Sequence, residues 1–137
     1  MPRELISGGT GPIFRRVWLI VGWILVLAVV YLSVAHVVVR PPGLGGDKLG
    51  HLIAYGALTF WFSQLDQGRG ARAQIVLAFV ALGVSLEFVQ GRLPYRSYDE
   101  IDMLANTAGV ALGWLASPPR TPNILLWLEA LVHRRGR

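Results

Sequence analysis

The chain has 137 residues, of which 53% are hydrophobic and only 15% are charged. Ordinary soluble domains carry about 25% charged residues, so this composition argues against a soluble globular enzyme and against disorder, and favours an integral membrane protein. The net charge is +5, and the absence of cysteine excludes disulfides, thiolate metal sites and cysteine nucleophiles.

Apolar runs separated by glycine, proline and charged residues predict four membrane-spanning helices, at residues 17–39, 47–65, 73–90 and 98–116. The first run is too long for the apolar part of a cleavable signal peptide, so we expect it to stay in the protein as a span. A final segment, residues 122–133, is too short to span. We expect it to form an amphipathic helix at the membrane interface, with Thr121 as N-cap and Pro122 at its first position.

The basic residues predict the orientation of these helices. With four spans, both termini and the loop between the second and third helices share one side, which holds nine basic residues against four on the other. The positive-inside rule places that side in the cytoplasm. We therefore expect an all-α, multi-pass protein with a cytoplasmic tail (1–16), a four-helix membrane domain (17–116) and an interfacial helix with a basic tail (117–137). His36 is expected at the outer interface.

In this topology the start of the second helix, the end of the third and the start of the fourth meet at the outer face. These three ends carry most of the unusual polar residues, namely Asp47, Lys48, His51, Tyr55, Glu87, Gln90, Asp99, Asp102 and Asn106. Within each helix these residues, apart from Lys48, follow one another at spacings of three or four positions, which places them roughly along one helix face. The sequence therefore predicts one polar site in the outer leaflet.

Glu87 is the most informative of these residues, because it lies in an apolar run near the negative end of its helix. An unpaired carboxylate is costly there, so we expect it to carry a proton or to pair with a cation, for which the sequence offers Lys48, His51, Arg92 and Arg96. Such an ion pair and a functional role are equally open. His51 could be a general base, a headgroup ligand or a buried hydrogen-bonding residue. Gln90 and Asn106 could simply bond between helices.

Other residues have local explanations. Ser97 and Glu100 form a capping-box pattern that predicts Ser97 as the N-cap of the fourth helix, and Asp47 could cap the second helix. A metal site built from His51, Glu87 and Asp102 would have only one histidine and no thiolate, so we expect no metal and no cofactor. One face of the fourth helix carries small residues every four positions, which is typical of close helix packing: Ala105, Gly109 and Gly113.

Several segments together resemble the VanZ-like family over about half of the chain: DKLGHLIAYGALTFW at 47–61, E-x-x-Q at 87–90, LPYRSYD at 93–99, I-D at 101–102 and N-x-x-G-x-x-x-G at 106–113. The resemblance implies a small multi-pass protein of the bacterial cytoplasmic (inner) membrane. The founding member of the family is associated with resistance to the glycopeptide antibiotic teicoplanin, and the family label assigns no reaction. The family positions that carry over coincide with the predicted outer site: Asp47, Lys48, His51, Tyr55, Glu87, Gln90, Arg96, Ser97, Asp99, Asp102 and Asn106.

Three functions are compatible with these observations. In the first, helix N-termini and the cations Lys48, Arg92 and Arg96 hold an anionic or lipid-linked ligand of the cell envelope, with membrane lipids as neighbours. In the second, an intramembrane enzyme uses Glu87 or His51 as general acid or base, although no activated nucleophile is evident. In the third, the chain is a non-catalytic accessory or assembly subunit that docks on a membrane protein through its small-residue face. No nucleic-acid module is visible, so we expect no nucleic-acid partner.

Overall fold

The computed structural model describes residues 11–35, 46–66 and 68–135, and all regular secondary structure in these ranges is helical. Five helices follow one another: α1 (Pro12–Val34), α2 (Gly46–Phe62), α3 (Arg69–Gln90), α4 (Glu100–Leu115) and α5 (Ile124–Arg135). The expected all-α class is thus confirmed, with one helix in each of the five predicted stretches.

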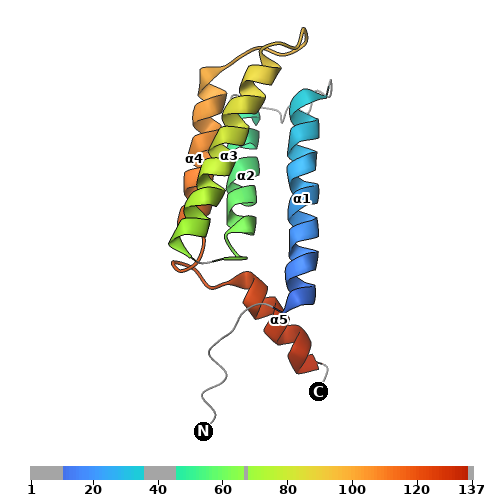
Figure 1. Cartoon of the computed structure of the whole chain (residues 1–137). Coiled ribbons are helices and arrows are strands. Elements are labelled where there is room, and N and C mark those ends of the chain that lie inside the picture. Colours follow the sequence, from blue (N-terminus) through green and yellow to red (C-terminus); the bar gives the residue numbers. More distant parts are fainter. Residues whose placement is uncertain (1–10, 36–45, 67, 136–137) are drawn as a thin grey trace.

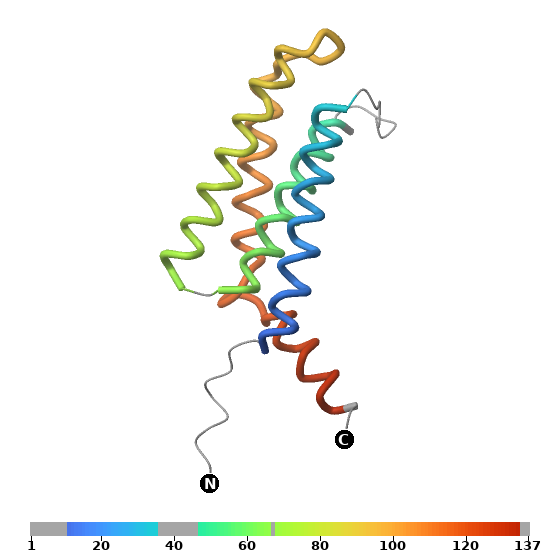
Figure 2. The backbone as a smooth tube through the Cα atoms, turned by 45° about the vertical axis from the view of Figure 1, so that its right-hand side comes forward, coloured from blue at the N-terminus to red at the C-terminus, as the bar shows by residue number. Residues whose placement is uncertain are grey.

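Helices α1 to α4 run side by side and alternate in direction, while α5 lies obliquely beside the start of α1 (Figures 1 and 2). Helices α1 and α3 finish, and α2 and α4 begin, at one end of this bundle, which we call the polar end. The start of α3, the finish of α4 and helix α5 lie at the opposite end. The helix ends that carry the predicted site therefore do come together.

Two helices, α1 and α3, are long and apolar enough to cross a membrane. Helices α2 and α4 have 17 and 16 residues, and helices of that length measure only about 25 Å against a hydrocarbon core of about 30 Å. The spanning character expected of four helices is thus supported by length and composition for two of them. For α2 and α4 it stays a prediction.

Glycine residues let α2 and α4 approach each other closely, and these two helices form the most extensive contact of the bundle. A Cβ atom on Gly109 would collide with the carbonyl oxygen of Leu52, and one on Gly113 with the carbonyl oxygen of Gly56. The small-residue face of α4 is therefore occupied by α2 of the same chain. A partner protein could use this face only by displacing α2.

The ends of α1 and α3 differ from those predicted. Helix α1 begins at Pro12, five positions earlier than expected, with proline at the first turn, where its missing N–H costs nothing. It finishes at Val34, because Ala35 is extended, with φ −70° and ψ 147°. The remainder of the predicted helix, residues 36–39 with His36, lies outside the described residues. Helix α3 begins at Arg69, not at 73.

The N-caps predicted for the last two helices are wrong. Asp99, not Ser97, caps α4, since its side chain accepts the N–H of Ile101 at 2.8 Å while its backbone is extended. Helix α5 begins at Ile124, beyond the expected cap at Thr121, because two side-chain oxygens reach its first turn. Oε1 of Gln64 accepts the N–H of Ile124 at 2.9 Å. Oδ1 of Asn123 accepts the N–H of Leu126, two residues further along, at 3.0 Å.

Candidate functional site

Lys48 lies at the centre of the polar end. It occupies the first turn of α2, and its Nζ donates to Oδ2 of Asp99 at 2.7 Å and to Oδ1 of Asp102 at 2.9 Å. Asp102 is buried, whereas the side chains of Lys48 and Asp99 are each 36% exposed. The ammonium group therefore joins the start of α2 to the start of α4 at the surface of the bundle.

The carboxylate of Asp99 has two roles at this point. It accepts hydrogen bonds from Nζ of Lys48 and from the backbone N–H of Ile101. These two bonds, the one from Lys48 having the larger effect, hold the pKa of Asp99 below its ordinary value. Both partners stabilise the charged form of the carboxylate. Asp99 is thus an ionised cap that fixes where α4 begins.

His51 lies one turn further along α2 and is partly buried. Its Nδ1 is 3.0 Å from Oδ1 of Asn106 on α4, and its Nε2 is 3.6 Å from Oδ2 of Asp102 and 3.9 Å from Oδ1 of Asp47. Because an amide oxygen accepts, a bond to Asn106 in this arrangement is donated by Nδ1–H. Nε2 then faces the two carboxylates.

The residues that could hold a metal ion differ from the set weighed in the sequence. Ligand atoms of Asp47, His51 and Asp102 all lie within 4.8 Å of one another, whereas Glu87 does not belong to this group. Lys48 already supplies a positive charge 2.9 Å from Asp102. The group therefore has the donor types for a divalent cation, but one of its three ligands is already paired.

Glu87 is buried in α3, with 1% of its surface exposed. Its Oε1 accepts the backbone N–H of Asp99 at 2.7 Å, while its Oε2 has no hydrogen-bond partner among the described residues. None of the four cations considered as partners forms an ion pair with it in the part of the chain that the structure describes. Of the two alternatives expected for Glu87, a bound proton or an ion pair, the ion pair is therefore not found there. Tyr55 on α2 is 2% exposed, and its hydroxyl likewise lacks a partner there.

Gln90 and Arg96 lie at the polar end, but their side chains bond to the backbone of α1. Nε2 of Gln90 donates to the carbonyl oxygen of Ser33 at 3.0 Å, and a guanidinium nitrogen of Arg96 donates to that of Leu32, also at 3.0 Å. These are carbonyl groups of the last turn of α1, which have no partner inside the helix. The two side chains therefore cap α1 and turn away from the charged cluster.

Sequence reasoning missed two contributors to this end. The hydroxyl of Tyr95 donates to the carbonyl oxygen of Val34 at 2.8 Å and adds to the capping of α1. Gly83 of α3 lies where a Cβ would come within 3.0 Å of Cβ of Asn106 and 3.2 Å of Cε1 of Tyr55. A glycine inside an apolar helical run was the available signal for such a close approach.

The fold and this site define a class: an all-helical bundle with two apolar helices long enough to span, and a buried carboxylate beside an ion-paired cluster at one end. The chain belongs to the VanZ/LLP1 family, whose model matches residues 11–124. It is also 35% identical over 72 residues to an uncharacterised protein of Schizosaccharomyces pombe, a match that covers 50% of this chain and 44% of the yeast protein. The chain thus spans less than half the length of that relative. No solved structure matches it.

Proposed function

We propose that the polar end binds the headgroup of a lipid-linked component of the cell envelope. The observation that carries the proposal is Glu87, a buried carboxylate whose Oε2 has no hydrogen-bond partner among the described residues. The buried hydroxyl of Tyr55 is in the same condition. Buried polar atoms are almost always satisfied, and ionisable residues inside membrane bundles are functional candidates by default. A ligand that supplies hydrogen bonds to these two groups accounts for both.

The charges favour one class of headgroup. Four carboxylates gather around Lys48 and His51 at this end, namely Asp47, Glu87, Asp99 and Asp102. The exposed Glu100 and the cations Arg92 and Arg96 lie further out at the same end. Lys48 is held by two of the four carboxylates, Arg96 donates to a carbonyl oxygen of α1, and Arg92 donates to the carbonyl oxygen of Phe88. The cations expected to hold an anion are thus already engaged. A headgroup that donates hydrogen bonds from hydroxyl or amino groups, as a lipid-linked sugar or peptide does, fits this end better than a bare anion.

A second candidate function is that of an accessory or assembly subunit, and it is favoured by the bonds that the polar residues make between helices. Lys48, His51 and Glu87 each bond to α4 or to its N-cap. If these bonds only hold the helices together, the polar end is structural and the chain acts through other surfaces. The two candidates differ in what happens when an unpartnered group is removed.

Tyr55→Phe separates them, because the hydroxyl that it removes has no hydrogen-bond partner in the described part of the chain. The full chain would be extracted with its surrounding lipid into polymer discs, and the retained envelope lipids would be quantified by mass spectrometry beside the thermal midpoint. We expect Tyr55→Phe to keep the midpoint of the wild type and to lose most of one enriched lipid species. Glu87→Gln is expected to lose the same species.

Glu100→Gln is the matched control for Glu87→Gln, since it makes the same chemical change at an exposed position of α4. It is expected to retain the wild-type lipids. Unchanged lipid in Tyr55→Phe and Glu87→Gln would contradict the ligand proposal. Unchanged lipid together with a large fall of the midpoint in Glu87→Gln would support the structural role.

We further propose that α1 to α4 all cross the bacterial cytoplasmic membrane, with both termini in the cytoplasm. The lack of native cysteine allows a test by single substitutions. Ser97→Cys, in the exposed turn between α3 and α4, should react in intact cells with a membrane-impermeant maleimide. Gly70→Cys, where a Cβ meets no atom within 4 Å, should react only after lysis. The reverse pattern would overturn this orientation.

The association of the founding family member with teicoplanin resistance leads to one further proposal, which rests on the ligand function. Expression of this chain in a susceptible bacterium should raise the inhibitory concentration of teicoplanin. Glu87→Gln should abolish the increase, while Glu100→Gln should preserve it. An equal increase with Glu87→Gln would separate resistance from the polar end.

A further inference from the structure

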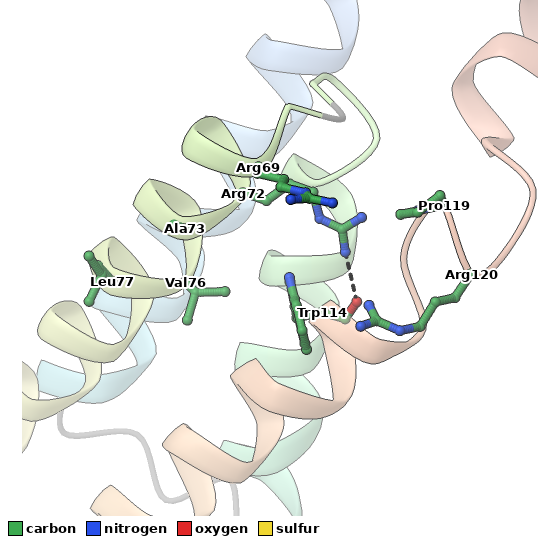
Figure 3. Close-up of a pocket in the computed structure, with 8 residues that line it drawn as sticks. All are labelled: Arg69, Arg72, Ala73, Val76, Leu77, Trp114, Pro119 and Arg120. Atoms are coloured by element: carbon green, nitrogen blue, oxygen red, sulfur yellow. Dashed lines mark hydrogen bonds between the residues drawn. The ribbon is translucent and has the colours of Figure 1, made fainter.

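A pocket of about 760 Å³ lies at the opposite end of the bundle, between the start of α3, the finish of α4 and the segment that follows α4. Three of its lining residues are arginines, Arg69, Arg72 and Arg120, and Figure 3 shows the guanidinium groups of Arg72 and Arg120 beside Trp114. Apolar side chains of α3 form the adjoining wall. The pocket contains none of the residues of the polar end.

Arg72 is the unusual residue of this pocket, because it is 5% exposed and yet carries a charge. Its guanidinium donates to the carbonyl oxygen of Trp114 at 3.1 Å, and in Figure 3 this bond points from α3 to the end of α4. A guanidinium has five N–H donors. No carboxylate lies within 4.0 Å of it among the described residues, as no ion pair involves Arg72 there. A buried charge normally has a counter-charge, so this one calls for an anion.

A second arginine, Arg120, adds to the positive charge that lacks an anionic partner among the described residues of this pocket. The guanidinium carbon of Arg120 lies 4.1 Å from the ring centroid of Trp114, and that of Arg72 lies 5.6 Å from it. Two like charges are thus held against one indole. The acids described at this end are engaged elsewhere, since Asp66 accepts the N–H of Gly68 and Glu129 accepts the N–H of Gly11. The described protein groups therefore leave the arginines without a negative partner.

The start of α3 adds to the positive potential. Its N-cap, Gly68, has no side chain that could cap the helix, and Arg69 is its first residue. The carboxylate of Asp66 accepts the N–H of Gly68 itself, which precedes the N–H groups of the first helical turn. Free N–H groups at a helix N-terminus favour phosphate, and arginine pairs with phosphate oxygens through two parallel bonds. Next to these groups, Val76 and the 68% exposed Leu77 offer an apolar wall. A charged mouth with an apolar wall suits a molecule that has a phosphate head and a hydrocarbon chain.

We propose that this pocket binds the phosphate group of an anionic phospholipid, with Arg72 and Arg120 as its counter-charges and the α3 wall against its acyl chain. On the predicted orientation the lipid belongs to the cytoplasmic leaflet. The site is independent of the polar end and of the ligand proposed there. It makes the folded bundle sensitive to the anionic lipid content of its membrane.

The test uses the purified full chain in detergent, titrated with phosphatidylglycerol, phosphatidylcholine or inorganic phosphate, with the thermal midpoint and native mass spectrometry as readouts. Phosphatidylglycerol should raise the midpoint and bind as discrete adducts, whereas phosphatidylcholine should not. Arg120→Met should weaken phosphatidylglycerol binding about tenfold, as expected for one lost charge-assisted contact. Arg92→Met is the control, because Arg92 is an exposed arginine in the turn after α3, at the polar end, whose guanidinium bonds to the carbonyl oxygen of Phe88 in α3.

Arg72→Met gives a second, independent readout. Without anionic lipid it should have a higher midpoint than the wild type, since it removes a buried unpaired charge. With phosphatidylglycerol this advantage should shrink or reverse. Equal binding of both lipids, or phosphatidylglycerol binding unaffected by Arg120→Met, would overturn the proposal. A midpoint shift with inorganic phosphate but none with phosphatidylglycerol would overturn the lipid assignment and mark a site for soluble phosphate.

Discussion

The indole rings of Trp18 and Trp61 stack with 3.7 Å between their centroids and 6° between their planes, and each ring nitrogen donates to the backbone carbonyl oxygen of the other residue at 2.9 Å. This reciprocal contact fastens the first half of α1 to the end of α2. Gln90 and Arg96 fasten the other end of α1 to the α3–α4 region. Helix α1 is therefore attached at both ends by side chains that bond to backbone carbonyl groups.

The first prediction concerns this tryptophan pair. Trp61→Phe keeps an aromatic ring but removes one of the two donors, so the free energy of unfolding should fall by about 1–3 kcal/mol. The thermal midpoint in detergent measures the change. Trp127→Phe, at a tryptophan of α5 that is 59% exposed, should leave the midpoint within about 1 °C of the wild type, since surface changes are usually close to neutral. Equal effects of the two variants would contradict the structural role of the pair.

The second prediction concerns the far end of α1. Gln90→Met keeps the size of a side chain that is 5% exposed but leaves the carbonyl group of Ser33 without its donor. Leaving such a group unsatisfied costs about 1–3 kcal/mol, and the last turn of α1 should open more often. Hydrogen exchange of the amides of residues 30–35 should accelerate. Gln74→Met, at an exposed position of α3, which also carries Gln90, should leave the exchange of these amides unchanged. Unchanged exchange in Gln90→Met would show that the cap formed by Gln90 is dispensable.

The third prediction tests the glycine contacts of α2 and α4. Gly113→Ala places a methyl group against the carbonyl oxygen of Gly56, so the helices must move apart. We expect a loss of about 1–3 kcal/mol, as is typical of overpacking. Gly50→Ala is the matched control, because a Cβ there meets no atom within 4 Å. Its midpoint should stay or rise, since alanine favours a helix by about 1 kcal/mol over glycine. A rise in both variants would contradict the close crossing.

The fourth prediction follows from the lowered pKa of Asp99. Asp99→Asn keeps a good N-cap but removes the charge that pairs with Lys48, so the wild type should be more stable at neutral pH. A carboxyl whose pKa is lowered by folding contributes stability above its unfolded pKa and loses it as the pH falls through its folded pKa. The gap in thermal midpoint between wild type and variant should therefore close below the ordinary aspartate value of 3.8. A gap that persists at that acidity would show that the charge of Asp99 is not its cause.

Several features of this protein follow from residue order alone. Helices of alternating direction bring the starts of α2 and α4 and the finishes of α1 and α3 to one end, so Lys48, His51 and Glu87 could be assigned to a common site. The spacing of Gly109 and Gly113 likewise indicated a close helix contact. These inferences need only the helical period, the breakers between helices and the number of helices, all of which are local properties of the chain.

The tertiary structure decided which partner each polar group takes. Lys48 pairs with Asp99 and Asp102, and not with Glu87. The side chains of Gln90 and Arg96 bond to carbonyl groups of α1. The N-cap of α4 is Asp99, and not Ser97. Arg72 is recognisable as a candidate lipid-binding residue only in the folded structure, where the end of α4 places Trp114 and Arg120 beside it. Such pairings depend on how far each helix is rotated about its axis and how closely the axes approach. Rotation and approach follow from side-chain packing across the whole bundle, which no local pattern specifies.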